Sequence, residues 1–297
     1  MRTRALLILL GALILGDAPR VLAQEIGAPR LIAMGQSLWT EELTWMDVRD
    51  RVAEGYTTVL IGSGGVEQNG PYLATGKHNF VLTTVMPYIA RAIGNTLIAP
   101  VVKFVPEGQV EPTTSGHMLY PGTISVSEAT YAALLSDMAK SYQAHGFRDI
   151  ILIGDSGGNG PGMRNVAEAL NGQWTSEGSG ARVHYLPEYY DEDRWSYDFL
   201  KSQGITQIDS ISGRRVDERT DRRNGMHTDI YYEAQSAVQN PDFIRAAQRE
   251  AVGQLNLHGV NLSPISKTIE LGERLAEYRA EITARAFRAS MERTRGR

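Results

Sequence analysis

Two glycine-rich segments of the sequence carry acidic and imidazole side chains of the kinds that bind metal ions. The first holds Glu67 and ends at His78, and the second, Gly154-Asp-Ser-Gly-Gly-Asn159, holds Asp155. A carboxylate and an imidazole brought together by one such loop suit a hard or borderline divalent cation. Because the chain has no cysteine, thiolate ligands, disulfides and a thiol nucleophile are all excluded. We therefore predict that Glu67, His78 and Asp155 bind one ion and leave a position open for water, as catalytic sites do.

Each of these three residues also has a purely structural interpretation. Glu67 could bind a backbone amide, and His78 could cap the helix that follows it. Asp155, which is a catalytic candidate as well as a predicted ligand, could be a helix N-cap, a position that Asp often fills. The metal interpretation therefore depends on all three side chains pointing to one place.

Four further residues could hold a substrate or move protons in the same cleft. His117 lies in the long irregular segment from Lys103 to Thr123, and loops of that length are usually functional. His227 and Asp229 lie in a late loop and could ligate the metal or move protons, and Glu188 follows the last predicted strand. Any of them could pass a proton to a leaving nitrogen, and the sequence alone does not choose among them.

The second glycine-rich segment also supports a competing interpretation. Gly154-Asp-Ser-Gly-Gly158 fits G-x-S-x-G, the nucleophile elbow of serine hydrolases with an α/β fold, and it lies between a predicted strand and a predicted helix. Ser156 would then be the nucleophile, Asp191 or Asp193 the acid, and His227 the base. This serine esterase or amidase would leave the first glycine-rich segment unexplained. A third alternative is a protein that binds a small molecule without turning it over.

The elements that must position these residues alternate between strands and helices. Apolar, β-branched runs predict strands at 57–61, 96–102, 149–153 and 182–186. Helical patterns cover 43–54, 79–93, 125–145, a stretch after 162, 241–255 and 265–293. Thr44 with Asp47, and Ser125 with Glu128, have the spacing of capping boxes. The alternation predicts a mostly parallel sheet with helices on both faces, and ligands bind beyond the carboxyl ends of such strands.

The first 23 residues have the pattern of a secretory signal peptide. Arg2 and Arg4 precede the apolar run Ala5 to Gly16, and Val21-Leu22-Ala23 offers a cleavage site. An apolar run of about 12 residues is too short to span roughly 30 Å of hydrocarbon, and no later segment looks able to do so. We therefore expect a signal peptide at 1–23, a periplasmic or secreted protein, and one domain over 24–297 with a C-terminal helix.

Charge and motifs narrow the range of ligands. The formal net charge is -4 and no block of basic residues occurs, so nucleic acid is not an expected partner. Neither glycine-rich segment has the spaced lysine of a P-loop or a G-x-G-x-x-G fingerprint, so a phosphate-bearing cofactor is not expected.

Three motifs in the same order resemble the creatininase (creatinine amidohydrolase) family. The family's Glu-Gln-His-Gly-Pro-His-Leu loop, which ends in Gly-Thr-Asp, corresponds to Glu67-Gln-Asn-Gly-Pro-Tyr-Leu73, which ends in Gly76-Lys-His78. Its Phe-Pro-Gly-Thr-Ile-Ser segment corresponds to Tyr120-Pro-Gly-Thr-Ile-Ser125. Its His-Gly-Phe, apolar strand and Asn-Gly-His-Gly-Gly-Asn correspond to His145-Gly-Phe147, the strand at 149–153, and the second glycine-rich segment. The resemblance covers roughly residues 40–260 and favours the metal site over the nucleophile elbow.

This resemblance implies a three-layer α/β/α sandwich that hydrolyses small amides or lactams and assembles as a homo-oligomer, often a hexamer. It also implies one or two divalent ions, usually zinc or manganese. The chain departs from the family at ligand positions, because the family's histidine after Glu-Gln is Asn69, its aspartate is His78, and its second histidine falls on Ser156. Glu67 is retained. We therefore expect a single ion, Zn²⁺ with Mn²⁺ as the alternative.

Overall fold

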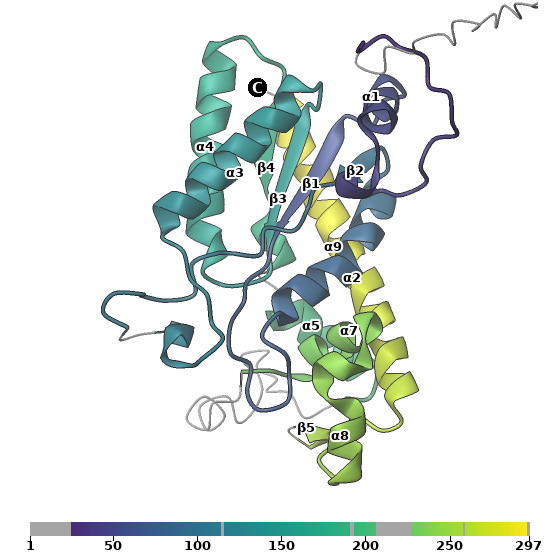
Figure 1. Cartoon of the computed structure of the whole chain (residues 1–297), viewed down its shortest axis with the longest axis vertical. Coiled ribbons are helices and arrows are strands. Elements are labelled where there is room, and N and C mark those ends of the chain that lie inside the picture. The colour runs from purple at the N-terminus through teal and green to yellow at the C-terminus, as the bar shows by residue number, and fades with distance from the viewer. Residues whose placement is uncertain (1–24, 114–115, 191–192, 206–226, 258, 296–297) are drawn as a thin grey trace, which may run out of the picture. The chain divides into compact units, whose positions relative to one another are not determined.

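The computed structural model describes residues 25–113, 116–190, 193–205, 227–257 and 259–295 (Figure 1). Gly35–Arg297 forms one compact unit, and the residues before it belong to a second. Within that second unit, a turn is closed by a hydrogen bond from Ala28 N to Glu25 O, 2.9 Å long. The predicted signal peptide at 1–23 lies outside the described residues, and the predicted domain boundary stays a prediction.

Four parallel strands form the central sheet. They are β1 (Thr58–Ser63), β2 (Thr96–Ile98), β3 (Asp149–Gly154) and β4 (Arg182–Tyr185), and they are ordered β2-β1-β3-β4. In the pairing of β1 with β3, Thr58 faces Asp149 and Ser63 faces Gly154. The two strands therefore end side by side, and the glycine-rich segments that follow them leave the sheet at the same edge.

Helices surround this sheet and continue to the end of the chain. The longer ones are α1 (Trp45–Ala53), α2 (Lys77–Ile93), α3 (Glu128–Ala144), α4 (Asn159–Ser176), α5 (Asp193–Ser202), α7 (Ile230–Gln239), α8 (Ala246–Ala251) and α9 (Ile265–Arg295). Short 3-10 turns occupy Thr40–Glu42, Gly116–Leu119, Pro187–Tyr189 and Pro241–Ile244, and β5 (Asn256–Leu257) pairs antiparallel with β6 (Val260–Asn261). Among the helices of the described residues, none is both long and apolar enough to cross a bilayer.

Alternate residues of the strands point to opposite faces, and each face is buried. Leu60 and Ile151 pack with residues of α2, α7 and α9, whereas Val59 and Ile150 pack with residues of α3 and α4 (Figure 1). Burying each such aliphatic side chain contributes about 1.5–3 kcal/mol, which explains why the strands read as continuous apolar runs. The predicted three-layer α/β/α arrangement is confirmed.

Local signals were correct at one predicted helix start and wrong at another. Thr44 and Asp47 form the predicted capping box before α1, with Asp47 N donating to Thr44 Oγ1 over 3.2 Å. The predicted box at Ser125 is wrong, because Ser127 caps α3 and Ser125 Oγ instead donates to Gly108 O over 2.8 Å. Ser125 therefore braces the long segment that precedes α3.

The predicted helix over 241–255 is also interrupted. A 3-10 turn ends at Ile244, Arg245 adopts a left-handed conformation with φ of 53°, and α8 begins at Ala246. A non-glycine residue in this region breaks the helical path, so the segment forms two short pieces.

Candidate metal centre

Glu67 lies at the centre of the candidate site, in the segment that follows β1. Its side chain is 1% exposed. Asn69 holds this segment in shape, because its Nδ2 donates to Glu67 O over 2.9 Å and to Ala74 O over 3.0 Å. The amide at Asn69, which replaces a family histidine, therefore serves the loop backbone.

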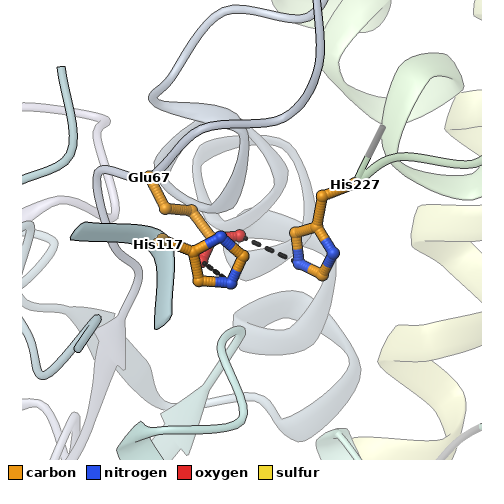
Figure 2. Close-up of side chains that lie close together, drawn as sticks. All are labelled: Glu67, His117 and His227. Carbon is orange, nitrogen blue, oxygen red and sulfur yellow. Dashed lines mark ion pairs between the residues drawn. The ribbon is translucent and has the colours of Figure 1, made fainter. Parts of the chain in front are cut away.

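Two imidazoles approach Glu67 from the open side of the site (Figure 2). His117 Nε2 lies 3.1 Å from Glu67 Oε2, and His227 Nε2 lies 3.2 Å from Glu67 Oε1. The histidine side chains are 25% and 29% exposed, and their ring centroids are 4.5 Å apart. One ligand atom from each residue falls within 4.8 Å of the other two, close enough to hold one metal ion. We call Glu67, His117 and His227 the front cluster.

A second set of side chains lies behind Glu67 and is closed to solvent. His78 Nε2 lies 2.8 Å from Glu67 Oε1, and His78 Nδ1 lies 2.8 Å from Asp155 Oδ2. The other oxygen of Asp155, Oδ1, accepts hydrogen bonds from Tyr189 OH and from Arg279 Nη1, each 2.9 Å long. We call His78, Asp155, Tyr189 and Arg279 the rear row.

The structure thus brings the three predicted ligands together, but as a row of hydrogen bonds. Both ring nitrogens of His78 face carboxylates, so in this arrangement neither has a lone pair directed at an ion that Glu67 and Asp155 could share. Among the described residues, the three-ligand group with suitable spacing is the front cluster, which combines one predicted ligand with two residues predicted as catalytic. Binding of an ion by either set stays a prediction.

Lys77, the residue before His78, places a buried cation against the same carboxylate. Its Nζ lies 3.1 Å from Glu67 Oε1 and donates to His227 O over 2.8 Å, and its side chain is fully buried. Nζ also lies 4.4 Å from the centroid of the Tyr232 ring. Lys77 therefore links the segment after β1 to the segment before α7.

Glu107 adds a second buried carboxyl group beside Glu67. It is 5% exposed and accepts a hydrogen bond from Ser156 Oγ over 3.2 Å, while its Oε1 has no hydrogen-bond donor among the described residues. Two glycines, Gly65 and Gly158, leave space for the part of the long segment that holds Glu107. A Cβ at Gly65, whose φ is +157°, would collide with Glu107 Oε1, and a Cβ at Gly158 would collide with Pro106 O.

The charges set the protonation of both carboxyl groups. Burial alone would raise the pKa of Glu67, but the charges of Lys77 and His78 and the hydrogen bonds from His227 and His78 outweigh it. The pKa of Glu67 therefore lies well below its ordinary value. Burial and the negative charge of Glu67 together raise the pKa of Glu107 to about 9. At neutral pH Glu67 is a carboxylate and Glu107 is a carboxylic acid.

The two imidazoles on either side of Glu67 also differ in pKa and therefore in protonation. Burial lowers the pKa of His78, but the charge of Glu67 and the bonds to both carboxylates raise it to about 9. Burial and the charge of Lys77 lower the pKa of His227 to about 4. His78 is therefore an imidazolium at neutral pH, and His227 is a neutral imidazole. Nε2 of His227 offers a lone pair to a cation in the tautomer that carries the ring proton on Nδ1.

The remaining sequence candidates lie around this centre. Asp229 caps α7 by accepting a hydrogen bond from Tyr232 N over 3.2 Å, and its charge acts on Lys77. Glu188 is exposed, whereas the adjacent Tyr189 is buried in the rear row. Asp191 and the side chain of Asp193 lie outside the described residues.

Sequence analysis missed Lys77, Glu107 and Arg279, although each had a signal. Lys77 is a cation just before the predicted helix at 79–93, and in the structure it is the first residue of α2, where the helix dipole disfavours positive charge. Glu107 lies between Pro106 and Gly108 in the segment expected to be functional. Arg279 falls on the buried face of α9 that also carries Leu275.

A cavity of about 240 Å³ opens beside Ser156 at the same end of the sheet. Its walls include Arg164 and the rings of Tyr185 and Tyr190. Tyr190 therefore lines the cavity, whereas the adjacent Tyr189 is in the rear row.

Comparison with known proteins points to one family. The profile of the family described as Creatinine amidohydrolase matches residues 41–287. A creatinine amidohydrolase from Pseudomonas putida is 28% identical over 120 residues, which cover 40% of this chain. That match spans less than half of the relative, 45% of its length.

Solved structures show the same fold. A mutant creatininase described as of the Zn-Zn type has a TM-score of 0.61 at 18% identity, with 86% of this chain and 99% of that chain covered. A structure described as Creatininase Mn has a TM-score of 0.60 at 17% identity, with 87% and 99% covered. At this level of identity, the likeness establishes the fold alone.

Proposed function

This chain belongs to the creatininase family, and we propose that it is a metal-dependent hydrolase of C–N bonds in small linear or cyclic amides. The observation that carries the proposal is the front cluster. Three segments distant in the sequence bring a carboxylate oxygen and two imidazole nitrogens within 4.8 Å of one another at a partly exposed position.

The front cluster fits a divalent ion in both charge and donor type. Glu67 stays ionised, His227 stays neutral, and one carboxylate with two imidazoles is a ligand set that catalytic zinc sites use. We propose one ion, Zn²⁺ or Mn²⁺, held by Glu67, His117 and His227. When bound, such an ion lowers the pKa of its water and polarises a carbonyl.

The chain's own residues supply the proton chemistry. Glu107 holds a proton at its carboxyl group at neutral pH and lies beside Glu67, so it is the residue best placed to protonate a leaving nitrogen. Ser156 Oγ fixes the orientation of that carboxyl group through Glu107 Oε2. His78 and Lys77 keep Glu67 ionised and hold it in place.

The adjacent cavity supports a small substrate. Its volume of about 240 Å³ fits a molecule the size of an amino-acid derivative or a small lactam, and Ser156 forms part of its wall. We propose that the substrate side group occupies this cavity while its amide faces Glu67 and Glu107.

The serine hydrolase alternative is not favoured. Ser156 Oγ donates to Glu107 and not to an imidazole, and its side chain is buried. His227, the base that this alternative requires, contacts Glu67 through Nε2. A small-molecule binder without turnover remains an outcome that experiment must exclude.

Metal analysis combined with hydrolysis assays tests the proposal. We expect purified protein to contain one equivalent of zinc or manganese and to hydrolyse members of a panel of small amides and lactams. Chelation and Glu67→Ala should abolish both metal binding and turnover, whereas Glu168→Ala, an exposed carboxylate on α4, should change neither. Turnover that survives chelation would exclude the metal enzyme. Bound metal without any turnover would favour the small-molecule binder.

Two features outside the site complete the proposal. We propose that the protein is periplasmic or secreted, because residues 1–23 have the signal-peptide pattern, and that it forms a homo-oligomer as the family resemblance implies. Cell fractionation with N-terminal sequencing of the mature chain, and sedimentation of the purified protein, would test these two features separately.

A further inference from the structure

Lys77 occupies a position that is unfavourable for a cation on two counts. Its side chain is fully buried, and burying an ammonium group is costly unless the charge is paired. It is also the first residue of α2, a 17-residue helix whose N-terminal end is electrostatically positive. A lysine at such a position needs compensating negative charge.

That negative charge comes from the candidate metal centre and its surroundings, and the Tyr232 ring adds a cation–π contact. Nζ lies 3.1 Å from Glu67 Oε1 and 2.8 Å from the carbonyl oxygen of His227. Burial lowers the pKa of Lys77, while the charges of Glu67, Asp229 and Asp155 act against that shift. Two of these partners, Glu67 and His227, belong to the front cluster. Carboxylate and carbonyl oxygens are also the donors that hard cations use, although here they hold the ammonium at hydrogen-bond distances.

The rear side of Glu67 is therefore already filled by cations. Lys77 Nζ and His78 Nε2 both contact Oε1 from this side, while His227 contacts Oε1 and His117 contacts Oε2 from the front. Asp155, the next carboxylate, is bound to Arg279 and His78. A divalent ion that used Oε1 from behind would meet both charges.

We propose that the Lys77 ammonium is the resident cation on the rear side of Glu67 Oε1, which keeps a second divalent ion from binding there and so limits the site to one ion. The inference rests on the proposed function, because it concerns the same metal centre. It makes Lys77 a positioning residue that holds Glu67 and the segment of His227 while it repels further cations.

Metal stoichiometry tests this inference without any assay of activity. The protein would be titrated with Zn²⁺ and with Mn²⁺ by calorimetry, and metal content would be measured by mass spectrometry after gel filtration. The wild type should bind one equivalent. Lys77→Ala, which removes the ammonium and opens its space, should bind a second equivalent.

Two matched variants separate the charge from the fold. Lys77→Arg keeps a positive charge and should bind one equivalent, as the wild type does. Lys77→Gln keeps a hydrogen-bond donor for His227 O without the charge, and it should bind the first ion about tenfold more tightly because the repulsion is gone. Lys77→Gln also provides the test if Lys77→Ala fails to fold.

The outcomes distinguish the role of Lys77 from the proposed function. Unchanged stoichiometry and affinity in both neutral variants would overturn the inference and leave the proposed function intact. A wild type that binds no ion, with a Lys77→Ala variant that binds one, would support Lys77 as the cation of the site and overturn the proposed function. The absence of binding in every variant would overturn both.

Discussion

The front cluster and the rear row use the same side-chain types for different ends. Each joins a carboxylate to an imidazole, through Glu67 with His227 in front and Asp155 with His78 behind. In front, the imidazole is partly exposed and its pKa is lowered to about 4; behind, the imidazole is buried between two carboxylates and its pKa is raised to about 9. The front can offer a lone pair to an ion, whereas the rear is a closed network of ion pairs.

The difference shows that residue type does not determine whether a carboxylate and a histidine form a metal site. We infer that the environment of the imidazole matters, because the rear ring is enclosed between two carboxylates whereas the front ring is partly exposed. Arg279 balances Asp155 inside the rear row, so we expect that row to contribute stability and the front cluster to contribute binding. The following predictions test this division, beginning with the largest effect.

Arg279→Met should destabilise the protein by about 3–5 kcal/mol, because it leaves the buried Asp155 carboxylate without its cation. Urea denaturation of the metal-free protein measures this change. Arg274→Met, which removes an exposed arginine from the same helix, should cost about 1 kcal/mol or less. Equal losses in the two variants would show that the rear row has no special structural role.

His227→Gln should weaken metal binding by about 100-fold or more, because even residues that only support metal ligands contribute 10–100-fold. The free energy of unfolding of the metal-free protein should change by no more than about 1 kcal/mol, since the side chain is partly exposed. Calorimetric titration and urea denaturation give the two values. His78→Gln should instead lose mainly stability and keep most of its metal affinity. If both variants lose mainly stability, the front cluster and the rear row do not have different roles.

The stability of the metal-free protein should fall as pH rises from 6 to 8, on the order of 1 kcal/mol per pH unit for each raised group. Glu107 keeps a proton in the folded state up to a pKa of about 9, whereas in the unfolded state it loses the proton near its ordinary value of 4.5. The stability that this proton contributes is therefore full below pH 4.5 and is lost as pH rises through about 9.

Glu107→Gln isolates this contribution, because glutamine keeps the shape of the protonated acid and does not titrate. The slope of stability against pH should be smaller in the variant than in the wild type, by on the order of 1 kcal/mol per pH unit. His78, whose pKa is also raised to about 9, should account for part of the slope that remains. Identical slopes would mean that Glu107 is ionised in the folded protein.

The smallest effect is expected at Ser156. Ser156→Ala removes one hydrogen bond to Glu107, and because that bond lowers the pKa of Glu107, its loss leaves Glu107 protonated at neutral pH. Turnover should therefore change by only a few-fold, since a neutral hydrogen bond contributes about 1 kcal/mol. Loss of activity by several orders of magnitude in steady-state assays would instead identify Ser156 as a nucleophile.

Much of the fold could be predicted from the sequence. The buried strands were visible as apolar runs because both faces of a parallel sheet are covered, and the Thr44 capping box was visible because it is local. The predicted capping box at Ser125 is wrong because the Ser125 hydroxyl donates to Gly108 O in the preceding segment. The spacing between Ser125 and Glu128 gives no information about that contact.

The sequence by itself determined that the segments after β1 and β3, which hold Glu67 and Asp155, leave the sheet at one edge, because parallel strands end at the same edge. The strand order, which puts these two ends side by side, was decided by the tertiary structure. Only the tertiary structure decided which imidazole faces an opening and which is enclosed. His117 and His227 reach Glu67 from segments 50 and 160 residues away in sequence, and the charges of Lys77, Glu107 and Arg279 act over a few ångströms through buried space. The spacing of residues along the chain does not predict such distances between side chains. Burial, which shifts the pKa values, arises only when the helices pack against the sheet.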